Sequence, residues 1–504
     1  MDESRVPVLI GGGQITQRDA EPDVALEPLA LMRQAALQAA EDAALPASAL
    51  ANADLVSVVN ILGWSYANPP GALAQELGAR PRQLWYSTLG GNSPQWLVNE
   101  IASQIAAGHV GLAVLAGAEA IATLQRARRK GMPLQWQAGQ APGLPEATVM
   151  GSNRPGSNEH EMAHGLTLPT AVYPLFENAL RHHYGWSIDR HRQELGTLCA
   201  CMTEVAAQNP YAWFPQRRTP EELVTVTSEN RMISFPYPKY LNAIIEVDQG
   251  AALLIASAAR ARELGVPEEK WVYLWGCADA QDHWYVSERI NYFSSPAIRM
   301  AGEQALRMAG WAIEEVDFFD LYSCFPSAVQ IARDALGMAR DDPRPLTVTG
   351  GLPYAGGPGN NYVTHAIATM LQVLRKHPGK KGLVTGLGWF ITKHSVGLYS
   401  TEPPPRPFVR EDPAVVQERL DAMPRPEVAV HAEGRGTVET YTVVHDRQGA
   451  PLRGIVIGRL EDGRRFLANA EGDPELLAAW EREEAIGTRG WVCSKEGKNC
   501  FMAR

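Results

Sequence analysis

The sequence predicts an α/β fold built from two successive βαβ cycles, followed by a small β-barrel domain. Strand-like apolar runs alternate with amphipathic helices up to about residue 401, and glycine-rich turns follow strands in both cycles. Short alternating strands appear only after a proline-rich segment. Because βαβ connections join parallel strands through right-handed crossovers, the sheet is expected to be largely parallel and covered by helices on both faces.

The first half of this fold is predicted to span residues 1–275. The apolar run at 6–10 predicts a buried strand that ends at Gly11. Ser93 followed by Pro94 is typical of an N-cap and a first helical position, so a helix is expected from there to about residue 107. A less regular excursion over about 121–240 is interpreted as functional or as a lid. The other segments predicted here are strands at 55–62 and 110–118, helices at 26–44, 172–183 and 188–209, and buried helix-and-strand segments at 243–261 and 270–277.

The second half is predicted to span residues 276–402 and to centre on residues 347–367, TVTGGLPYAGGPGNNYVTHAI. A short strand is expected at 346–348 and an apolar-periodic helix from about Tyr362. The glycines between them leave the backbone without Cβ atoms, and the helix start offers unpaired N–H groups and a positive dipole end. This combination is typical of an oxyanion or phosphate site, although an ordinary tight turn has the same composition. The other elements predicted here are helices at 297–310 and 328–336 and strands at 316–319 and 382–388.

After about residue 402 the sequence pattern changes from alternating strands and helices to a proline-rich segment and short strand-like runs. Residues 403–407, PPPRP, predict a linker, because neither a helix nor a central strand tolerates this density of proline. Beyond it, several short alternating runs with turn signals predict a small β-barrel within residues 408–504. The strands expected in this domain lie at 434–445, 454–460, 465–468 and 490–493.

Composition limits the partners and the location. The net charge of −10 argues against a nucleic-acid partner. No apolar run approaches the roughly 20 residues that span a bilayer, and the N-terminus lacks the basic and apolar regions of a signal peptide. We therefore expect a cytoplasmic protein that binds neither nucleic acid nor membrane. The six cysteines have no CxxC spacing, so reduced thiols are expected.

Several motifs together resemble the thiolase superfamily over roughly residues 5–401. They are VPVLIGGGQITQR, YLNAIIEVDQGAALLIAS, DLYSCF, GGLPYAGGPG and LVTGLG. The branch of sterol-carrier-protein thiolases and acetyl-CoA acetyltransferases looks nearest, and the tail GTVETYTVVHD…IVIGRLEDGRRFLA resembles OB-fold domains that accompany some thiolase-like proteins. The resemblance implies a duplicated five-layer fold plus an OB-like domain. It also implies an acyl-CoA substrate, no cofactor other than coenzyme A within that substrate, no metal, and a homodimer as one option.

The chain departs from the catalytic pattern of thiolases, which use a nucleophilic cysteine at a helix N-terminus, a second cysteine as acid/base, and two oxyanion holes. By the resemblance, the nucleophile falls on Gly91, the third-loop His or Asn on Tyr322, and the Gly-His-Pro histidine on Leu352. The second cysteine falls near Gly388. The backbone N–H groups of Gly91 and Gly388 remain available for an oxyanion hole. A cycle through an acyl-cysteine is therefore not expected.

Other side chains are candidates for the catalytic role. Tyr322 can exchange a proton with a substrate hydroxyl if its pKa is lowered, and its alternative role is that of a wall aromatic. The further catalytic candidates, each with a structural role as the alternative, are Tyr354, Cys324, His365 and His394. The residues expected to contact the substrate are Leu352, Gly356, Gly357 and Asn360.

Two further patterns are interpreted as structural. Residues 160–164 fit the zinc motif HExxH, but the flanking Gly, Ser and Pro residues are a poor context for the helix that this motif needs. The basic run at 126–130 can meet phosphates and is interpreted instead as a solvated face.

These observations favour an enzyme of acyl-CoA carbon–carbon bond chemistry. The resemblance alone implies an acyltransferase of the acetyl-CoA acetyltransferase kind in lipid metabolism. The missing cysteines favour retro-aldol cleavage of a 3-hydroxyacyl-CoA, in which Tyr322 takes the hydroxyl proton. The alternative from another class is a non-catalytic acyl-CoA-binding scaffold that uses the barrel as a docking module.

Overall fold

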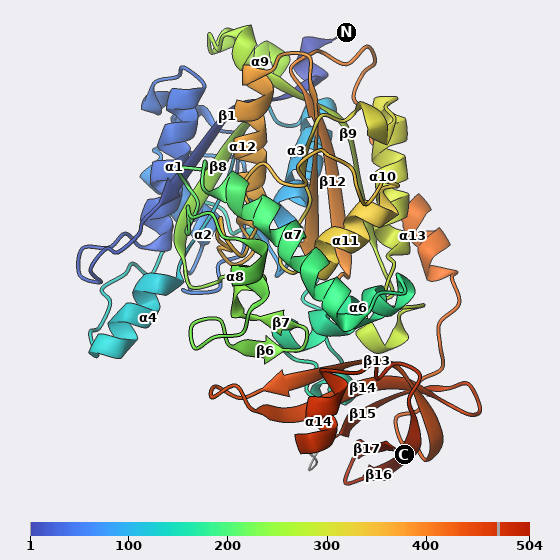
Figure 1. Cartoon of the computed structure of the whole chain (residues 1–504). Coiled ribbons are helices and arrows are strands. Elements are labelled where there is room, and N and C mark those ends of the chain that lie inside the picture. The colour runs from blue at the N-terminus through green and yellow to red at the C-terminus, as the bar shows by residue number, and fades with distance from the viewer. Residues whose placement is uncertain (1, 471–473, 504) are drawn as a thin grey trace.

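The computed structural model describes residues 2–470 and 474–503. The predicted domains at 1–275 and 408–504 therefore include a few residues that lie outside the described ones. An α/β body carries a β-barrel at one end, with α6 (Pro169–His183) beside the junction (Figure 1). Hydrogen bonds join the strands of the body into one continuous sheet in the order β10-β11-β12-β9-β1-β8-β4-β2-β3-β5. The described residues therefore form the mixed α/β fold that the sequence predicts, with the barrel as an addition.

The sheet repeats one plan in the two halves of the chain. The strands of the first half are β1 (Pro7–Thr16), β2 (Leu55–Val58), β3 (Gln83–Ser87), β4 (Leu112–Ala120), β5 (Thr148–Met150) and β8 (Asp248–Ser257). Those of the second half are β9 (Val272–Gln281), β10 (Phe318–Asp320), β11 (Lys381–Gly388) and β12 (Lys393–Ser400). The order β2-β4-β8-β1 matches β10-β11-β12-β9, with one parallel pair followed by two antiparallel pairs in each. The expectation of a largely parallel sheet was therefore wrong, because the last strand of each half returns antiparallel.

Helices pack on the outer face of each half of the sheet, and two further helices lie between the halves. Together the helices and the two halves of the sheet make five layers. Helix α1 (Pro28–Asp42) packs on β1 and β8, and α10 (Pro296–Ala309) packs on β9 and β12. Helices α3 (Ser93–Ala106) and α12 (Tyr362–Lys376) lie against each other and contact strands of both halves. The remaining α-helix of the second half is α11 (Pro326–Ala335). Helix α13 (Pro413–Asp421) follows the proline-rich segment at 403–407 and packs on β9.

Strand β1 does not end at its glycines, as expected from the sequence, but runs through them to Thr16. A Cβ on Gly11 would lie 2.1 Å from the Ala39 carbonyl oxygen of α1. On the other face, a Cβ on Gly12 would lie 3.1 Å from Ala368 of α12. The glycines therefore permit close packing of helices on both faces of this strand rather than a turn.

The predicted strand at 346–348 is absent from the described structure, because a side chain takes its backbone hydrogen bonds. The buried Asp320 carboxylate accepts hydrogen bonds from the Val348 and Thr349 N–H groups at 3.1 and 3.2 Å. It also accepts from the Thr347 hydroxyl at 2.9 Å and from the Tyr362 hydroxyl at 2.9 Å. These contacts fix the glycine-rich loop to the end of β10 and to the start of α12.

The C-terminal barrel consists of β13 (Gly434–His445), β14 (Pro451–Leu460), β15 (Arg465–Ala470), β16 (Arg489–Lys495) and β17 (Lys498–Ala503). Its order β13-β14-β15-β17-β16 closes through pairing of β16 with β13. Helix α14 (Pro474–Trp480) lies between the third and fourth strands in sequence, which is the OB-fold arrangement. Strand β17 was not predicted from the sequence.

The barrel is held against the body by side chains of both. The Thr440 hydroxyl donates to the Leu175 carbonyl of α6, and the Asn178 amide donates to the Tyr441 carbonyl. Arg465 of β15 is fully buried and donates to the Ser287 carbonyl of the body at 3.1 Å. The barrel is therefore docked through specific buried contacts.

The excursion after β4 supplies elements to both parts of the molecule. Strand β5 pairs with β3 at the edge of the sheet, while β6 (Met232–Ser234) pairs with β13 of the barrel. Its other elements are α4 (Ile121–Lys130), α5 (Glu159–Ala163), α7 (Ile188–Ala206), α8 (Pro220–Val224) and β7 (Tyr237–Pro238). Among the described residues, no helix combines the length and apolarity needed to cross a bilayer.

Candidate functional site

The site predicted at the start of α3 is built around a loop of small residues. Helix α3 begins one residue earlier than the Ser93 N-cap prediction, with Asn92 in the N-cap position and Ser93 inside the helix. A Cβ on Gly91 would lie 2.1 Å from the Tyr322 hydroxyl oxygen and 2.6 Å from the Leu387 carbonyl oxygen. The Tyr322 hydroxyl therefore occupies the space into which any side chain at position 91 would project.

The backbone and ring of Tyr322 are fixed by neighbouring residues, whereas its hydroxyl is not. It follows β10, its N–H donates to the Thr385 hydroxyl at 2.8 Å, and its ring packs edge-on against Tyr362. No described residue hydrogen-bonds its hydroxyl. Burial raises the pKa of Tyr322 above its usual range, with a further contribution from Cys324. The condition of a lowered pKa is therefore not met, and Tyr322 is a neutral phenol suited to donating a hydrogen bond.

Asn360 and Gly388 complete the surroundings of this loop. The Asn360 side-chain oxygen accepts the Gly90 N–H at 2.9 Å, and its side-chain amide donates to the Asn60 backbone carbonyl at 3.0 Å. A Cβ on Gly388 would lie 2.4 Å from the Asn92 side-chain oxygen. Gly91 and Gly388 thus lie on two segments that pack around Asn92, and both segments need glycine for that approach.

A buried lysine that the sequence analysis did not select also reaches this loop. Lys393 begins β12, is 8% exposed, and donates from Nζ to the Leu89 carbonyl. Burial lowers the pKa of Lys393 to about 8. A lone lysine at a strand start carries no sequence signal for a site, because the approach of Leu89 arises only from the tertiary structure.

The predicted substrate-contacting residues of the glycine-rich loop pack within the protein. Leu352 is 3% exposed, and its N–H donates to the Ser323 hydroxyl. A Cβ on Gly356 would lie 2.2 Å from the Gln249 side chain, and the Gly357 N–H donates to the Ile244 carbonyl at 2.8 Å. Their role in substrate contact stays a prediction, with Asn360 the member of the group that touches the Gly90 loop.

Cys324 and Tyr354 lie in buried surroundings beside this loop. Burial raises the pKa of the Cys324 thiol to about 12, although hydrogen bonding between this thiol and the Tyr173 side chain opposes the shift. Such a thiol is a weak nucleophile at neutral pH. The buried Tyr354 hydroxyl lies next to Cys199 and has no conventional hydrogen-bond partner. It faces α7 rather than the Gly91 loop.

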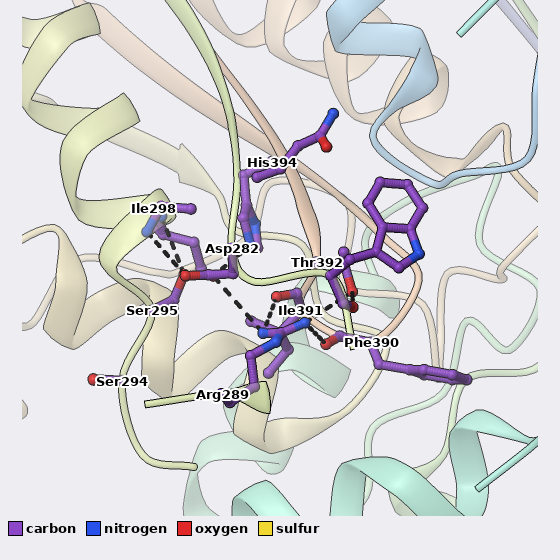
Figure 2. Close-up of polar contacts among 12 residues, drawn as sticks. Asp282, Arg289, Ser294, Ser295, Ile298, Phe390, Ile391, Thr392 and His394 are labelled. Carbon is purple, nitrogen blue, oxygen red and sulfur yellow. Dashed lines mark hydrogen bonds and ion pairs between the residues drawn. The ribbon is translucent and has the colours of Figure 1, made fainter. Parts of the chain in front are cut away.

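The two candidate histidines lie in different layers. His365, in the first turn of α12, places Nδ1 2.9 Å from the Gln14 side-chain oxygen, and burial lowers its pKa to about 3. His394 lies next to Lys393 on β12, and its Nε2 lies 3.3 Å from the Asp282 carboxylate (Figure 2). Neither histidine contacts the Tyr322 hydroxyl, but His394 and Tyr322 both line one small cavity of about 10 Å³.

Asp282 organises a buried polar cluster at the start of α10. It accepts hydrogen bonds from the Ser295 hydroxyl and the Ala297 N–H at the start of α10. Burial alone would raise the pKa of Asp282, but the His394 hydrogen bond and the Arg289 charge outweigh it and lower the pKa. Arg289 donates to the Phe390 and Ile391 carbonyls and to the Thr392 hydroxyl, as Figure 2 shows. The cluster thus fixes the turn that joins Gly388 to Lys393.

The HExxH segment has a structural role in the described chain. Residues Glu159–Ala163 do form a short helix, contrary to expectation, because Asn158 and Glu161 make a capping box. However, His164 Nδ1 contacts the His160 carbonyl and its Nε2 accepts the Asn499 N–H of the barrel at 2.9 Å. Within residues 2–470 and 474–503, no group of acidic, His and Cys side chains is arranged to hold a metal ion.

The basic run on α4 is largely neutralised by neighbouring carboxylates. Arg126 pairs with Asp248 at 2.9 Å, Arg129 with Glu246 at 3.3 Å, and Lys130 with Glu21. These ion pairs agree with a solvated face.

A duplicated mixed sheet with two central helices, and a glycine-lined helix start between its halves, is the architecture of the thiolase superfamily. Residues 278–401 match the family model "Thiolase C-terminal domain-like", and residues 415–497 match "Thiolase-like protein type 1 additional C-terminal domain". The crystal structure of a monomeric SCP2-thiolase like protein type 1 from Mycobacterium smegmatis is 38% identical, with a TM-score of 0.86 over all of both chains. The chain belongs to this family of type 1 thiolase-like proteins.

More distant curated relatives match only part of their length. An acetyl-CoA acetyltransferase of Methanocaldococcus jannaschii is 26% identical over 182 residues, which is 36% of this chain and 44% of the relative. A steroid side-chain-cleaving aldolase of Thermomonospora curvata is 27% identical over 198 residues, which is 38% of this chain and 48% of the relative. The chain thus spans about half the length of the curated relatives it matches.

Proposed function

We propose that the protein cleaves or forms a carbon–carbon bond next to an acyl-CoA thioester without an acyl-cysteine. The reaction that fits the residues best is retro-aldol cleavage of a 3-hydroxyacyl-CoA. The observation that carries this proposal is the Tyr322 hydroxyl, which no described residue hydrogen-bonds and which fills the space beside Gly91 where a thiolase nucleophile would project. The low-identity likeness to a steroid side-chain-cleaving aldolase supports the same class of reaction.

In this reaction the C2–C3 bond breaks, the 3-hydroxyl becomes a carbonyl, and the electron pair passes to the thioester as an enolate. The enolate oxygen needs hydrogen-bond donors. A neutral Tyr322 phenol and the backbone N–H groups of Gly91 and Gly388 are the donors that this chain offers. The reaction needs no cysteine nucleophile, which suits the raised pKa of Cys324.

A non-catalytic acyl-CoA-binding scaffold is the second candidate. It is favoured by how closely the predicted loop is packed, since Leu352 and Tyr354 are 3% and 4% exposed. A cavity that borders Tyr322 is only about 10 Å³, with mostly apolar walls and His394 among its lining residues. A scaffold would bind the thioester and leave it unchanged.

A Tyr322→Phe variant distinguishes the two candidates. Incubation with a panel of 3-hydroxyacyl-CoA and 3-oxoacyl-CoA compounds, followed by mass spectrometry, is expected to yield a shorter acyl-CoA plus an aldehyde or ketone from a 3-hydroxy substrate. The variant is expected to lose about 100-fold or more of this turnover, because it lacks the donor. Its stability should change little, since none of the residues in the structure's described ranges hydrogen-bonds the hydroxyl.

The control is Tyr273→Phe, a partly exposed tyrosine of β9. It should retain full turnover. Thioester binding without products would favour the scaffold, and equal turnover by Tyr322→Phe would refute the role of the hydroxyl.

A further inference from the structure

Lys393 is buried without a counter-ion. It is 8% exposed, and its amine has the Leu89 carbonyl as its hydrogen-bond partner. No carboxylate of the described residues forms an ion pair with it. Buried lysines without a counter-ion are rare, because leaving the charged form without an opposite charge in the interior is unfavourable.

The surrounding backbone is shaped to admit this amine. A Cβ on Gly90 would lie 2.5 Å from Lys393 Nζ, and a Cβ on Gly388 would lie 2.8 Å from Lys393 Cε. Gly90 is the neighbour of Gly91, against which the Tyr322 hydroxyl lies. The amine and the phenol thus approach consecutive residues of one loop at the start of α3.

Lys393 also lines a cavity of about 320 Å³ at the N-terminal end of α3. Trp96 and Trp284 provide apolar wall, and Asn92 brings a buried side-chain oxygen with no hydrogen-bond partner. The other charged or titratable residues of the wall are Glu100, Asp279, His394 and Arg410.

These other groups are already engaged. Arg410 contacts Glu100 at 2.9 Å and Asp279 at 2.7 Å, and His394 is next to Asp282. Among the described residues of this cavity, Lys393 is therefore the charged group without an oppositely charged neighbour. Burial lowers the pKa of Lys393 to about 8.

We infer that Lys393 is the proton acceptor of the site and that the cavity beside it receives the 3-hydroxy end of the acyl chain. This inference rests on the proposed retro-aldol reaction. The neutral amine takes the proton of the 3-hydroxyl as the C3–O double bond forms and the C2–C3 bond breaks. The electron pair moves to C2 and the thioester. The lysine ammonium then returns the proton to C2, so that one 3-hydroxyacyl-CoA gives one aldehyde or ketone and one shorter acyl-CoA.

The reactivity of the amine is tested on the native full-length protein without any substrate. Trace labelling with acetic anhydride between pH 6 and 11, followed by peptide mapping, gives a titration curve for each lysine. Lys393 is expected to label with a midpoint near pH 8. Exposed lysine amines have a pKa of about 10.4. Lys376, which is exposed at the end of α12, is the internal reference. A midpoint for Lys393 equal to that of the reference would overturn the inference, because a lysine that only supports the Leu89 carbonyl needs no free amine.

Two variants then test its role in turnover. Lys393→Met keeps the length of the side chain without the amine, and Lys393→Arg keeps the charge without a neutral form near pH 8. Both are expected to lower kcat about 100-fold or more and to remove the rise of kcat/KM with a midpoint near pH 8, since kcat/KM reports the pKa of the free enzyme. Normal turnover by Lys393→Met would contradict the assignment of Lys393. A reactive Lys393 in a protein that turns over no 3-hydroxyacyl-CoA would instead refute the proposed reaction, so the two failures are distinguishable.

Discussion

Replacing Gly91 by alanine is expected to destabilise the protein by about 1–3 kcal/mol and to abolish turnover. The added Cβ would lie 2.1 Å from the Tyr322 hydroxyl oxygen, 2.6 Å from its Cζ and 2.6 Å from the Leu387 carbonyl oxygen. None of these distances is tolerated, so the tyrosine and the loop must both move. Chemical unfolding measures the loss of stability, and product analysis measures the loss of activity.

The Tyr322→Phe background provides the matched control for this variant. Removing the hydroxyl oxygen removes the shortest clash, so Gly91→Ala should cost less stability in the phenylalanine background than in the native chain. A double-mutant cycle reports this coupling. Equal costs in both backgrounds would mean that the Tyr322 hydroxyl does not lie against position 91, and the proposed site would lose its basis.

An Arg289→Met variant is expected to lose about 3–5 kcal/mol of unfolding free energy. Arg289 is 4% exposed and is hydrogen-bonded to the turn at 390–392. Ile391 in that turn has a φ of 54°, a conformation that β-branched residues rarely adopt. The substitution removes the donors that hold the turn and leaves the Asp282 carboxylate buried without its nearby arginine.

Arg299→Met is the control, because Arg299 is exposed on α10 and should change stability by no more than about 0.5 kcal/mol. Adding Asp282→Asn to Arg289→Met should recover part of the loss, since it removes the buried charge that the arginine offsets. A loss below about 1 kcal/mol for Arg289→Met would show that the cluster does not support the turn.

Much of the fold follows from periodicity and punctuation in the sequence. The helix from Tyr362 begins where the apolar period begins, and β13 has the bounds that alternation predicts. The errors have physical causes. Gly11 to Gly13 are typical of a turn, yet they continue β1 because helices pack closely on both faces. The strand at 346–348 is missing because the side chain of Asp320, distant in sequence, takes its hydrogen bonds.

The site was predictable only in part. The departure of Gly91 and Tyr322 from the thiolase pattern is visible in the sequence, but their mutual contact is a tertiary fact. His394 was selected for its chemistry, but its imidazole lies against the Asp282 carboxylate rather than against the Tyr322 hydroxyl. Lys393 itself had no sequence signal, because its importance comes from burial and from the absence of a counter-ion.

Mass spectrometry of the intact protein and of its products, in samples quenched during turnover of a 3-hydroxyacyl-CoA, tests the central claim most directly. The account predicts that a shorter acyl-CoA and an aldehyde or ketone accumulate while the protein keeps its unmodified mass. A protein mass increased by the acyl group, mapped to Cys324 or another cysteine, would contradict it. The reaction would then proceed through an acyl-cysteine, which the proposed retro-aldol cleavage does not form.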